Sequence, residues 1–184
     1  MDELLDIVND NDIVTGQELR SVVHAHGLQH RGVHVFLFTR DGKMLVQKRS
    51  ADRAQYASQW DCSVSEHVKA GEEYLDAALR GMKEEMGVDG IEIQPLITFR
   101  MLYGPNDREI SRLYQGFVDP RLVRFDPLEI EEIEYYSLSE LRALMKSESL
   151  IFSYWFQQLI QWSQGEASAM NILTTHSDAR LFSG

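Results

Sequence analysis

The chain has 184 residues, of which 43% are hydrophobic and 26% charged, and its formal net charge is -11. This size and composition predict one soluble globular domain and exclude a disordered chain or a membrane-spanning one. The acidic balance disfavours nucleic acid as a main partner, because phosphate backbones are repelled. The acidic start MDELLDIVND lacks the basic and apolar regions of a secretory leader, so the cytoplasm is the expected location.

The N-terminal part, residues 1–25, is expected to form a β-hairpin followed by a short helix over 18–24. Two apolar runs flank the turn formers at 9–12, as in a hairpin. Residues 32–50 contain two β-rich runs joined by Asp41-Gly42, a dipeptide that favours a tight turn. The second segment is therefore predicted to be an antiparallel strand pair.

A helix is predicted over 73–86, where apolar side chains recur at helical spacing and Gly87 stands at the position of a C-terminal cap. The periodicity places these apolar side chains in the core: Leu75, Leu79, Met82 and Met86. It also puts Gly81 and Glu85 on one face, with Arg80 and Glu84 beside them.

The C-terminal half contains two expected strands, over 91–102 and 112–118, joined by the turn-rich GPNDRE. A helix over 138–145 follows Ser137 and Ser139 as candidate N-caps, and a docking helix is expected at about 151–163. Residues 1–165 are thus predicted to form a single domain, and 166–184 a tail with weak periodicity.

The single cysteine, Cys62, excludes an internal disulfide and a zinc site built from cysteines. Carboxylates and histidines remain as metal ligands, and carboxylates suit Mg²⁺ or Mn²⁺. An anionic substrate would need such a cation to offset repulsion from this acidic chain.

The segment 66–88 resembles the Nudix box, a loop-helix-loop signature of the Nudix superfamily. The matching positions are Glu72, Arg80, Met82, Glu84, Glu85, Gly87 and Val88. The resemblance implies an α/β fold: a Nudix-type α/β/α sandwich with a mixed central sheet, the box helix on one face and the C-terminal helix on the other.

The same resemblance implies roles for several box residues. Glu84 and Glu85 would hold Mg²⁺ or Mn²⁺, which neutralises a diphosphate and activates the attacking water. Glu72 and Arg80 would brace the loop against the helix. A solvated acidic face is the alternative interpretation of the paired glutamates.

Two positions depart from the box. Glu66 stands where a glycine usually opens it, and Gly81 stands where a glutamate usually follows the arginine. We hypothesise that Glu66 fills the coordination space left by Gly81 and joins the metal ligands. If the present enzyme is merely attenuated, Gly81→Glu is expected to add a ligand one turn from Glu85 and to raise hydrolysis. A folded variant without a gain would favour a binding domain or an arrangement that depends on Glu66.

A wider stretch, roughly residues 5 to 160, is similar to the isopentenyl-diphosphate isomerase branch of the superfamily. The matching segments are 30–31, 45–50 and 60–67. The resemblance implies a second metal site formed by His30, His67 and Glu109, with His24 or His26 as a looser match. Imidazoles with a carboxylate suit a divalent transition metal.

The isomerase reaction itself is not expected. In this register Ser65 stands at the position of the isomerase's cysteine and Ser111 at that of its glutamate, and serine hydroxyls are too weakly acidic for those proton transfers. Cys62 lies three residues before Ser65, an odd offset that on a strand points to the opposite face. Cys62 is therefore predicted to be a core residue.

Other candidates lie outside the box. Lys48 and Arg49 end a strand and could clamp phosphate oxygens, with surface solvation as the alternative for Lys48. Glu132, in the acidic run 129–134, is a speculative general base, with a solvated charge run as the alternative. Tyr103 and Trp155 could stack on a substrate or belong to the core.

The leading prediction is a metal-dependent hydrolase of a nucleoside or other organic diphosphate, acting by water attack on phosphorus. Its catalytic residues would be Glu84, Glu85 and Glu132, and its partner a small-molecule diphosphate. The alternatives are an isomerase-like enzyme and a metal- or diphosphate-binding domain without turnover. The sequence makes no prediction of oligomeric state.

Overall fold

The computed structural model describes residues 2–53 and 55–176. Its centre is an eight-stranded sheet in the order β10-β7-β8-β3-β4-β5, with β6 paired to β3 and β9 paired to β4. The strands are β3 (His30–Phe38), β4 (Met44–Arg49), β5 (Trp60–Asp61), β6 (Val64–His67), β7 (Ile93–Gly104), β8 (Asp107–Phe117), β9 (Ile130–Tyr136) and β10 (Asn171–Thr175). The pairing of β3 with β8 is parallel and the other pairings are antiparallel, so the sheet is mixed, as predicted.

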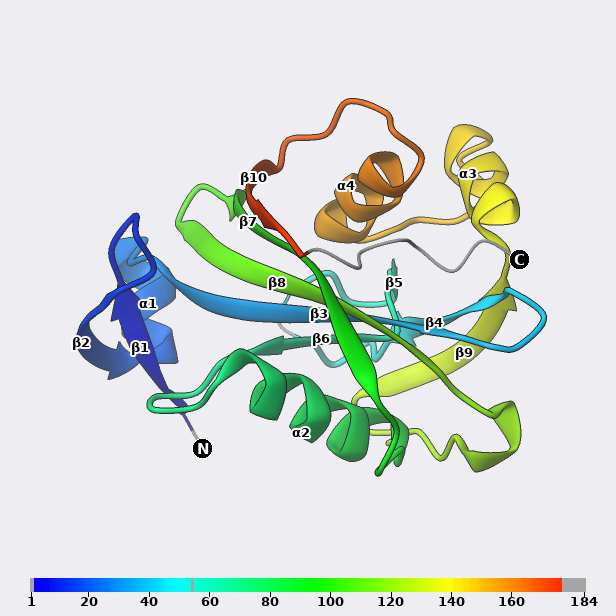
Figure 1. Ribbon diagram of the computed structural model, residues 1–184, viewed down its shortest axis with the longest axis horizontal. Coiled ribbons are helices and arrows are strands. Elements are labelled where there is room, and N and C mark those ends of the chain that lie inside the picture. Colours follow the sequence, from blue (N-terminus) through cyan, green and yellow to red (C-terminus); the bar gives the residue numbers. More distant parts are fainter. Residues whose placement is uncertain (1, 54, 177–184) are drawn as a thin grey trace.

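Helices cover both faces of this sheet. The helices are α1 (Arg20–His26), α2 (Tyr74–Met86), α3 (Leu138–Lys146) and α4 (Tyr154–Ser163), and a 3-10 turn spans Pro120–Leu122. Helix α2, the box helix, lies on one face, and α3 and α4 lie on the other (Figure 1). The expected α/β/α sandwich is confirmed. No helix in the described part of the chain has the length and apolar character needed to cross a membrane.

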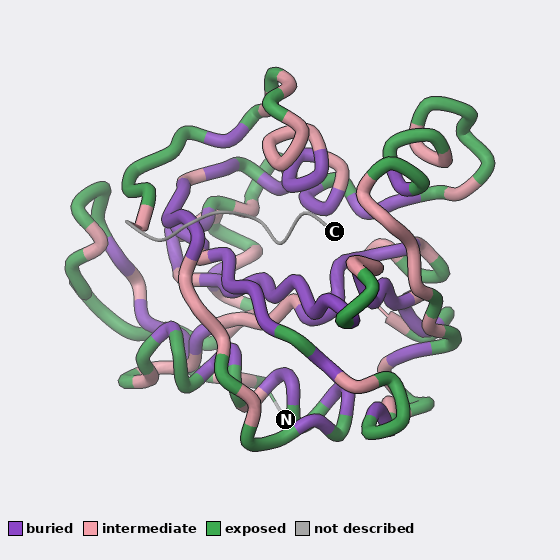
Figure 2. The backbone as a smooth tube through the Cα atoms, turned by 45° about the vertical axis from the view of Figure 1, so that its right-hand side comes forward, coloured by how far each residue is buried: buried purple, intermediate pink, exposed green. Residues whose placement is uncertain are grey.

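Strand β3 divides the core into two halves because its side chains alternate between the faces of the sheet. Val33, Val35 and Leu37 belong to the cluster under α2, whereas Phe36 and Phe38 belong to the cluster under α4. Burial runs along the central strands, while the outer sides of the helices and the loops are exposed (Figure 2).

The buried face of α2 differs from the prediction. Leu75 and Leu79 are 44% and 37% exposed, although Met82 and Met86 are buried as expected. The face toward the sheet carries Tyr74, Ala77, Ala78, Gly81, Met82, Glu85 and Met86. Because several of these side chains are small, the helix approaches the sheet closely and the two leucines lie at its margins.

The N-terminal segment forms the expected hairpin, a separate two-stranded sheet of β1 (Leu4–Val8) and β2 (Val14–Leu19). Its turn is stabilised by Asn9, whose Oδ1 accepts hydrogen bonds from the backbone N–H groups of Asn11 and Ile13. The short helix expected after it is α1, which carries His24 into the neighbourhood of β3.

The predicted tail is partly wrong. Residues 171–175 form β10, which pairs antiparallel with β7 and extends the sheet at its edge. All five residues of β10 are exposed. Because neither face of this strand is buried, its sequence need not alternate between apolar and polar residues, and the strand could not be predicted from that pattern. Residues 177–184 of the predicted tail lie outside the described residues.

Candidate active site

A cavity of about 420 Å³ opens beside β6 and α2. Its walls are unusually rich in ionisable groups: imidazoles, carboxylates and arginines from α1, β3, β4, β6, α2 and β8. Tyr103 and Trp155 belong to the buried hydrophobic core, as one of their two alternatives predicted, and both also line the cavity. Two groups of candidate metal ligands converge on this cavity.

The first group is a histidine cluster built from α1, β3, β6 and β8. Ligand atoms of His24, His30 and His67 lie within 4.8 Å of one another, as do those of His30, Asp107 and Glu109. The imidazole-to-carboxylate distances run from 3.6 to 3.8 Å, too long for hydrogen bonds. They are close to the roughly 3.0–3.5 Å that separates neighbouring ligands on one ion with bonds of about 2.1 Å.

The histidine cluster also leaves buried polar atoms without partners. Both ring nitrogens of His24, His30 Nε2 and Asp107 Oδ1 are buried and make no hydrogen bond. Buried polar groups are normally paired, so convergent unpaired donor atoms fit a bound cation. The structure thus brings together the expected His30, His67 and Glu109, selects His24 over the exposed His26, and adds Asp107.

Electrostatics around Glu109 agree with this fit. Burial alone would raise the pKa of Glu109, but His30 and His67 lower it to about 2, so this carboxylate is ionised. Burial lowers the pKa of His67 to about 3, which keeps its imidazole neutral and able to donate a lone pair to a metal. Burial and the neighbouring Glu109 raise the pKa of Asp107 to about 7.

The absence of a side chain at Gly32 of β3 leaves room for the Glu109 carboxylate. Gly32 is paired with Ser111 of β8, and a Cβ on Gly32 would collide with Glu109 Oε2 and lie 3.0 Å from Ser111 Oγ. The missing side chain is therefore what allows the Glu109 carboxylate to reach across β3 toward the histidines.

The second group is the box cluster of Glu66, Glu84 and Glu85. Glu85 is only 4% exposed; its Oε2 accepts a 2.7 Å hydrogen bond from Gln47 Nε2, and its Oε1 is buried without a partner. Burial, then the nearby Glu66, raises the pKa of Glu85 well above its ordinary range. An inward carboxylate with one unpaired oxygen beside further carboxylates fits a hard divalent cation.

The structure supports the hypothesis that Glu66 uses the space left by Gly81. A Cβ on Gly81 would lie 2.8 Å from Glu66 Cγ and 2.6 Å from Val64 Cγ1. A glutamate at position 81 would therefore require Val64 and Glu66 of β6 to move, and the effect of Gly81→Glu on hydrolysis stays a prediction.

Arg80 braces the box as expected. Its Nε donates to Glu72 Oε1 at 2.9 Å, and its Nη2 donates to the backbone oxygen of His67 at 2.8 Å. Its Nη1 also lies 3.1 Å from Glu66 Oε2 and 3.3 Å from Glu84 Oε2. Arg80 thus ties the box loop and the strand β6 to α2.

Of the three candidate residues outside the box, Arg49 lies at the cavity, whereas Lys48 and Glu132 do not. Arg49 lines the cavity, where its Nη1 donates to Asp61 Oδ2 at 3.3 Å and its guanidinium lies 5.5 Å from the Trp155 ring centre. Lys48 pairs instead with Glu131 at 2.8 Å. Glu132 is exposed on β9, and neither it nor Lys48 is among the cavity-lining residues.

Several cavity residues were not anticipated from the sequence. Arg53, paired with Glu129, and Arg20 add positive charge to the wall. Asp107 had a sequence signal, since it alternates with Glu109 and Ser111 along one strand face. Arg53 and Arg20 had none, because both lie outside any periodic pattern.

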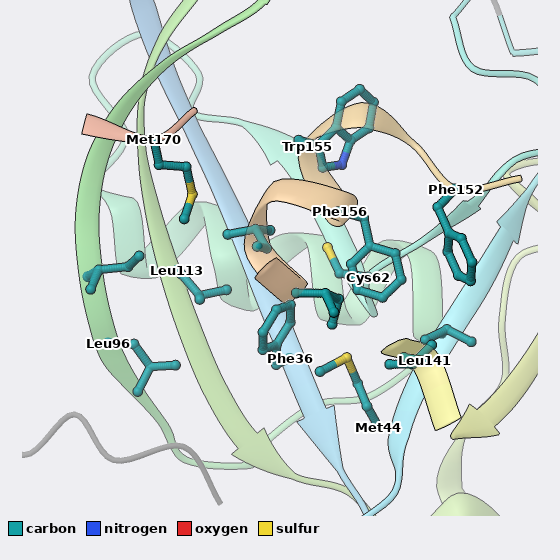
Figure 3. Close-up of a cluster of buried hydrophobic side chains, with 14 of the residues drawn as sticks. Phe36, Met44, Cys62, Leu96, Leu113, Leu141, Phe152, Trp155, Phe156 and Met170 are labelled. Atoms are coloured by element: carbon teal, nitrogen blue, oxygen red, sulfur yellow. The ribbon is translucent and has the colours of Figure 1, made fainter. Parts of the chain in front are cut away.

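The expectation that Cys62 points away from Ser65 is wrong. Cys62 Sγ lies 3.3 Å from Ser65 Oγ, because β5 ends at Asp61 and β6 begins at Val64, so strand alternation does not run through Cys62. Its predicted burial is confirmed: it lies in the core near Phe156 and Trp155 (Figure 3). Burial raises the pKa of the Cys62 thiol well above its ordinary range.

Comparison with known proteins agrees with this site. Residues 28–156 match the model of the NUDIX domain family. The chain belongs to the Nudix family.

Its relatives include isopentenyl-diphosphate isomerases and uncharacterised Nudix hydrolases. One is isopentenyl-diphosphate Delta-isomerase 2 of Photorhabdus laumondii, 30% identical over 166 residues, covering 87% of this chain and 92% of that protein. Another is an uncharacterised Nudix hydrolase of Streptomyces coelicolor, 42% identical over 102 residues. That match spans 55% of this chain and only 56% of the Streptomyces protein.

Among solved structures, the DR0079 protein of Deinococcus radiodurans superimposes with a TM-score of 0.75 and 26% sequence identity. The match covers 87% of this chain and 98% of that chain. The similarity therefore extends well beyond the box to nearly the whole of the Deinococcus protein.

Proposed function

We propose that this protein is a divalent-metal-dependent hydrolase of an organic diphosphate, such as a nucleoside diphosphate linked to another group. The observation that carries the proposal is that two groups of candidate ligands, each with buried and unpaired ligand atoms, contribute side chains to one cavity that is also lined by arginines. The box cluster contributes Glu66 and Glu84, and the histidine cluster contributes His67, Asp107 and Glu109. In so acidic a protein, a substrate with two or more negative charges needs the positive charge of bound metal ions as well as that of the arginines.

The donor sets differ in the cations that they suit. The box cluster offers only carboxylate oxygens, which suit Mg²⁺ or Mn²⁺, whereas the histidine cluster combines three imidazoles with two carboxylates and suits a transition ion such as Mn²⁺. A bound divalent cation supplies charge neutralisation for the diphosphate and lowers the pKa of water.

The chain's own groups would then bind substrate and move protons. A guanidinium has five N–H donors, and Arg49 uses its Nε and Nη1 on Gln55 and Asp61, so donors remain for phosphate oxygens. Glu85 would be the central metal ligand, with Glu66 beside it. Glu84 faces the cavity with a 57% exposed side chain, which suits a base that must reach water, better than Glu132 on β9.

The test is a screen of organic diphosphates with Mg²⁺ and with Mn²⁺, reading released phosphate or nucleotide. We expect metal-dependent turnover of at least one class, abolished by Glu85→Gln and retained by Glu92→Gln, which changes an exposed glutamate that does not line the cavity. Tight metal binding without turnover of any diphosphate would instead support a binding domain.

The isomerase is the second candidate, because Cys62 lies on the same side as Ser65 and because isomerases match 87% of the chain. Against it, Cys62 is fully buried with a raised thiol pKa, and Ser65 and Ser111 stand where the acid and base are needed. Incubation with isopentenyl diphosphate in deuterated water should give no incorporation at the allylic carbons by NMR. Incorporation that depends on protein and metal would make the isomerase the correct assignment.

A further inference from the structure

The N-terminal hairpin of β1 and β2 contacts the box at the loop between β6 and α2. We define the box loop as residues 69–72, which lie between those two elements. Leu5 of β1 forms an antiparallel bridge with Lys69, and β1 lies beside this loop (Figure 1). The family match spans residues 28–156, so the hairpin is an element outside the matched segment that touches the box.

The hairpin supplies acceptors for two of the four backbone N–H groups in the box loop. Ala70 donates its N–H to the backbone oxygen of Leu4 at 2.9 Å. Gly71 donates its N–H to Asp6 Oδ2, also at 2.9 Å. Backbone N–H groups are rarely left unpaired in folded proteins, so the partners of these two groups help to determine the conformation of the loop. The hairpin is therefore part of what fixes the box loop.

Asp6 is held in one orientation by contacts at both of its carboxylate oxygens. The residue is only 3% exposed, and its Oδ1 accepts a 2.8 Å hydrogen bond from Gln17 Nε2 on β2. A buried carboxylate is costly unless it is hydrogen-bonded, so the contact with Gln17 and the contact with Gly71 together allow its burial. Asp6 thus ties both strands of the hairpin to the box loop.

The other two N–H groups of the box loop close it around Glu72. The Lys69 N–H donates to Glu72 Oε2 at 3.0 Å, and the Glu72 N–H donates to the Lys69 backbone oxygen at 3.0 Å. Glu72 Oε1 accepts from Arg80 Nε at 2.9 Å. Arg80 Nη1 in turn lies 3.1 Å from Glu66 Oε2 and 3.3 Å from Glu84 Oε2. A continuous series of contacts therefore leads from the hairpin to two carboxylates of the box cluster.

We propose that Asp6 is a positioning residue of the box. It fixes the box loop, and through Glu72 and Arg80 it fixes the carboxylates of Glu66 and Glu84 as ligands to a cation. That these carboxylates bind a metal rests on the proposed function, whereas the hold of Asp6 on the box loop does not. Residues that orient metal ligands without touching the metal typically contribute about 10- to 100-fold in affinity.

Hydrogen exchange in the metal-free wild-type protein, followed by NMR, tests the contact between hairpin and loop. We expect the N–H groups of Ala70 and Gly71 to exchange about as slowly as the paired N–H groups of β1 and β2, because the hairpin must separate from the loop to release them. Exchange at the rate of an unstructured peptide would overturn the proposal without the need for any variant.

Asp6→Ala tests the transmission to the box. It removes the acceptor of the Gly71 N–H, so exchange at Gly71 and at Lys69 should become at least about tenfold faster. The affinity of the folded variant for Mg²⁺, measured by calorimetry, should fall by at least about tenfold. Mg²⁺ is the probe because it prefers oxygen ligands, and so it reports on the box cluster rather than on the imidazoles.

Asp6→Asn is the conservative variant. Its amide oxygen can still accept from the Gly71 N–H, and the Gln17 amide, which offers both a donor and an acceptor, can pair with the new amide N–H. Mg²⁺ affinity should therefore stay within about threefold of the wild-type value, as expected when a hydrogen bond is weakened rather than lost.

Asp10→Asn is the matched control within the same hairpin. It breaks the 2.6 Å ion pair between Asp10 Oδ1 and Arg100 Nη1 and leaves the contacts of the box loop in place. A hairpin that only stabilised the fold would lower the urea midpoint in Asp6→Ala and leave the Mg²⁺ affinity of the folded protein unchanged. Asp10→Asn should keep both the wild-type Mg²⁺ affinity and the wild-type exchange at Lys69.

The outcomes separate this proposal from the proposed function. Wild-type Mg²⁺ affinity in folded Asp6→Ala, or an equal loss in Asp10→Asn, would overturn the positioning role and leave the hydrolase intact. If the wild-type protein binds no Mg²⁺, the box is not the proposed metal site, and exchange at Lys69 decides the positioning role. Faster exchange in Asp6→Ala alone supports that role, and equal exchange in the two variants refutes it. If Asp6→Ala does not fold, wild-type exchange at Ala70 and Gly71 decides.

Discussion

Replacing Gly81 tests how the box is constructed. A Cβ there would lie 2.6 Å from Val64 Cγ1 and 2.8 Å from Glu66 Cγ, closer than side chains tolerate. Alanine favours a helix over glycine by about 1 kcal/mol, but overpacking a filled site costs about 1–3 kcal/mol. Val64 has little rotamer freedom to yield, because it is β-branched. Gly81→Ala should therefore be neutral to about 2 kcal/mol destabilising.

Gly81→Glu should cost more, because it adds a carboxylate beside Glu66 and Glu85. Two like charges about 6 Å apart repel by about 2–3 kcal/mol at an effective dielectric constant near 20. We expect the metal-free protein to lose about 2–5 kcal/mol in its free energy of unfolding, measured by urea denaturation. Gly16→Ala is the control, since nothing lies within 4 Å of its added Cβ, and it should change stability by less than about 0.5 kcal/mol.

The double variant Glu66→Gly with Gly81→Glu moves the carboxylate from strand to helix. It removes the Cγ contact and one like charge, so its destabilisation should be at least about 1 kcal/mol smaller than the two single effects combined. Additive single effects, or a Gly81→Glu variant as stable as wild type, would show that Glu66 does not occupy the space over Gly81.

Three further outcomes are expected. Glu85→Gln should weaken divalent-metal binding at the box by about 100-fold in calorimetry. In the metal-free wild-type protein, the free energy of unfolding should fall as pH rises above the ordinary carboxylate range, because the folded pKa of Glu85 is raised and its charged form is disfavoured. The Gln variant should lack this pH-dependent loss of stability. Gly32→Ala removes no ligand but displaces Glu109, so metal affinity at the histidine cluster should fall about tenfold or more. Alkylation of Cys62 at pH 8 should be about 100-fold slower in the native than in the unfolded protein, because burial raises its thiol pKa.

Elements with local chemical signals could be predicted from the sequence. Gly42 and Gly87 have φ values of 80° and 64°, the left-handed backbone that the hairpin turn and the helix cap require. Ser137 forms a capping box with Glu140 at the start of α3, where an N-cap was expected. In each case the determining contacts lie within a few residues along the chain.

Features that depend on distant neighbours could not be predicted. Which face of α2 is buried depends on how closely its small residues approach the sheet, and the spacing of apolar residues does not encode that distance. The position of Cys62 follows from the break between β5 and β6, and a break of two residues is enough to invalidate an argument from strand alternation. The contacts of His34 could not be predicted from the sequence, because its partners, Ser65 and Tyr103, are 31 and 69 residues away.

Contacts with residues distant in the sequence also explain why the box seems to lack a carboxylate when only its sequence is considered. An interior glycine is normally a weak point of a strand or helix, yet Gly32 and Gly81 each lie against a glutamate from a neighbouring strand, Glu109 and Glu66 respectively. At both places a side chain is omitted on one element so that a carboxylate from another can enter. For the box, this means that the carboxylate missing from α2 has a counterpart on β6, so the number of acidic groups around Glu85 is kept. We propose that Glu66 of β6 takes the ligand role that Gly81 leaves open on α2; on this proposal, Gly81 does not argue against metal-dependent turnover.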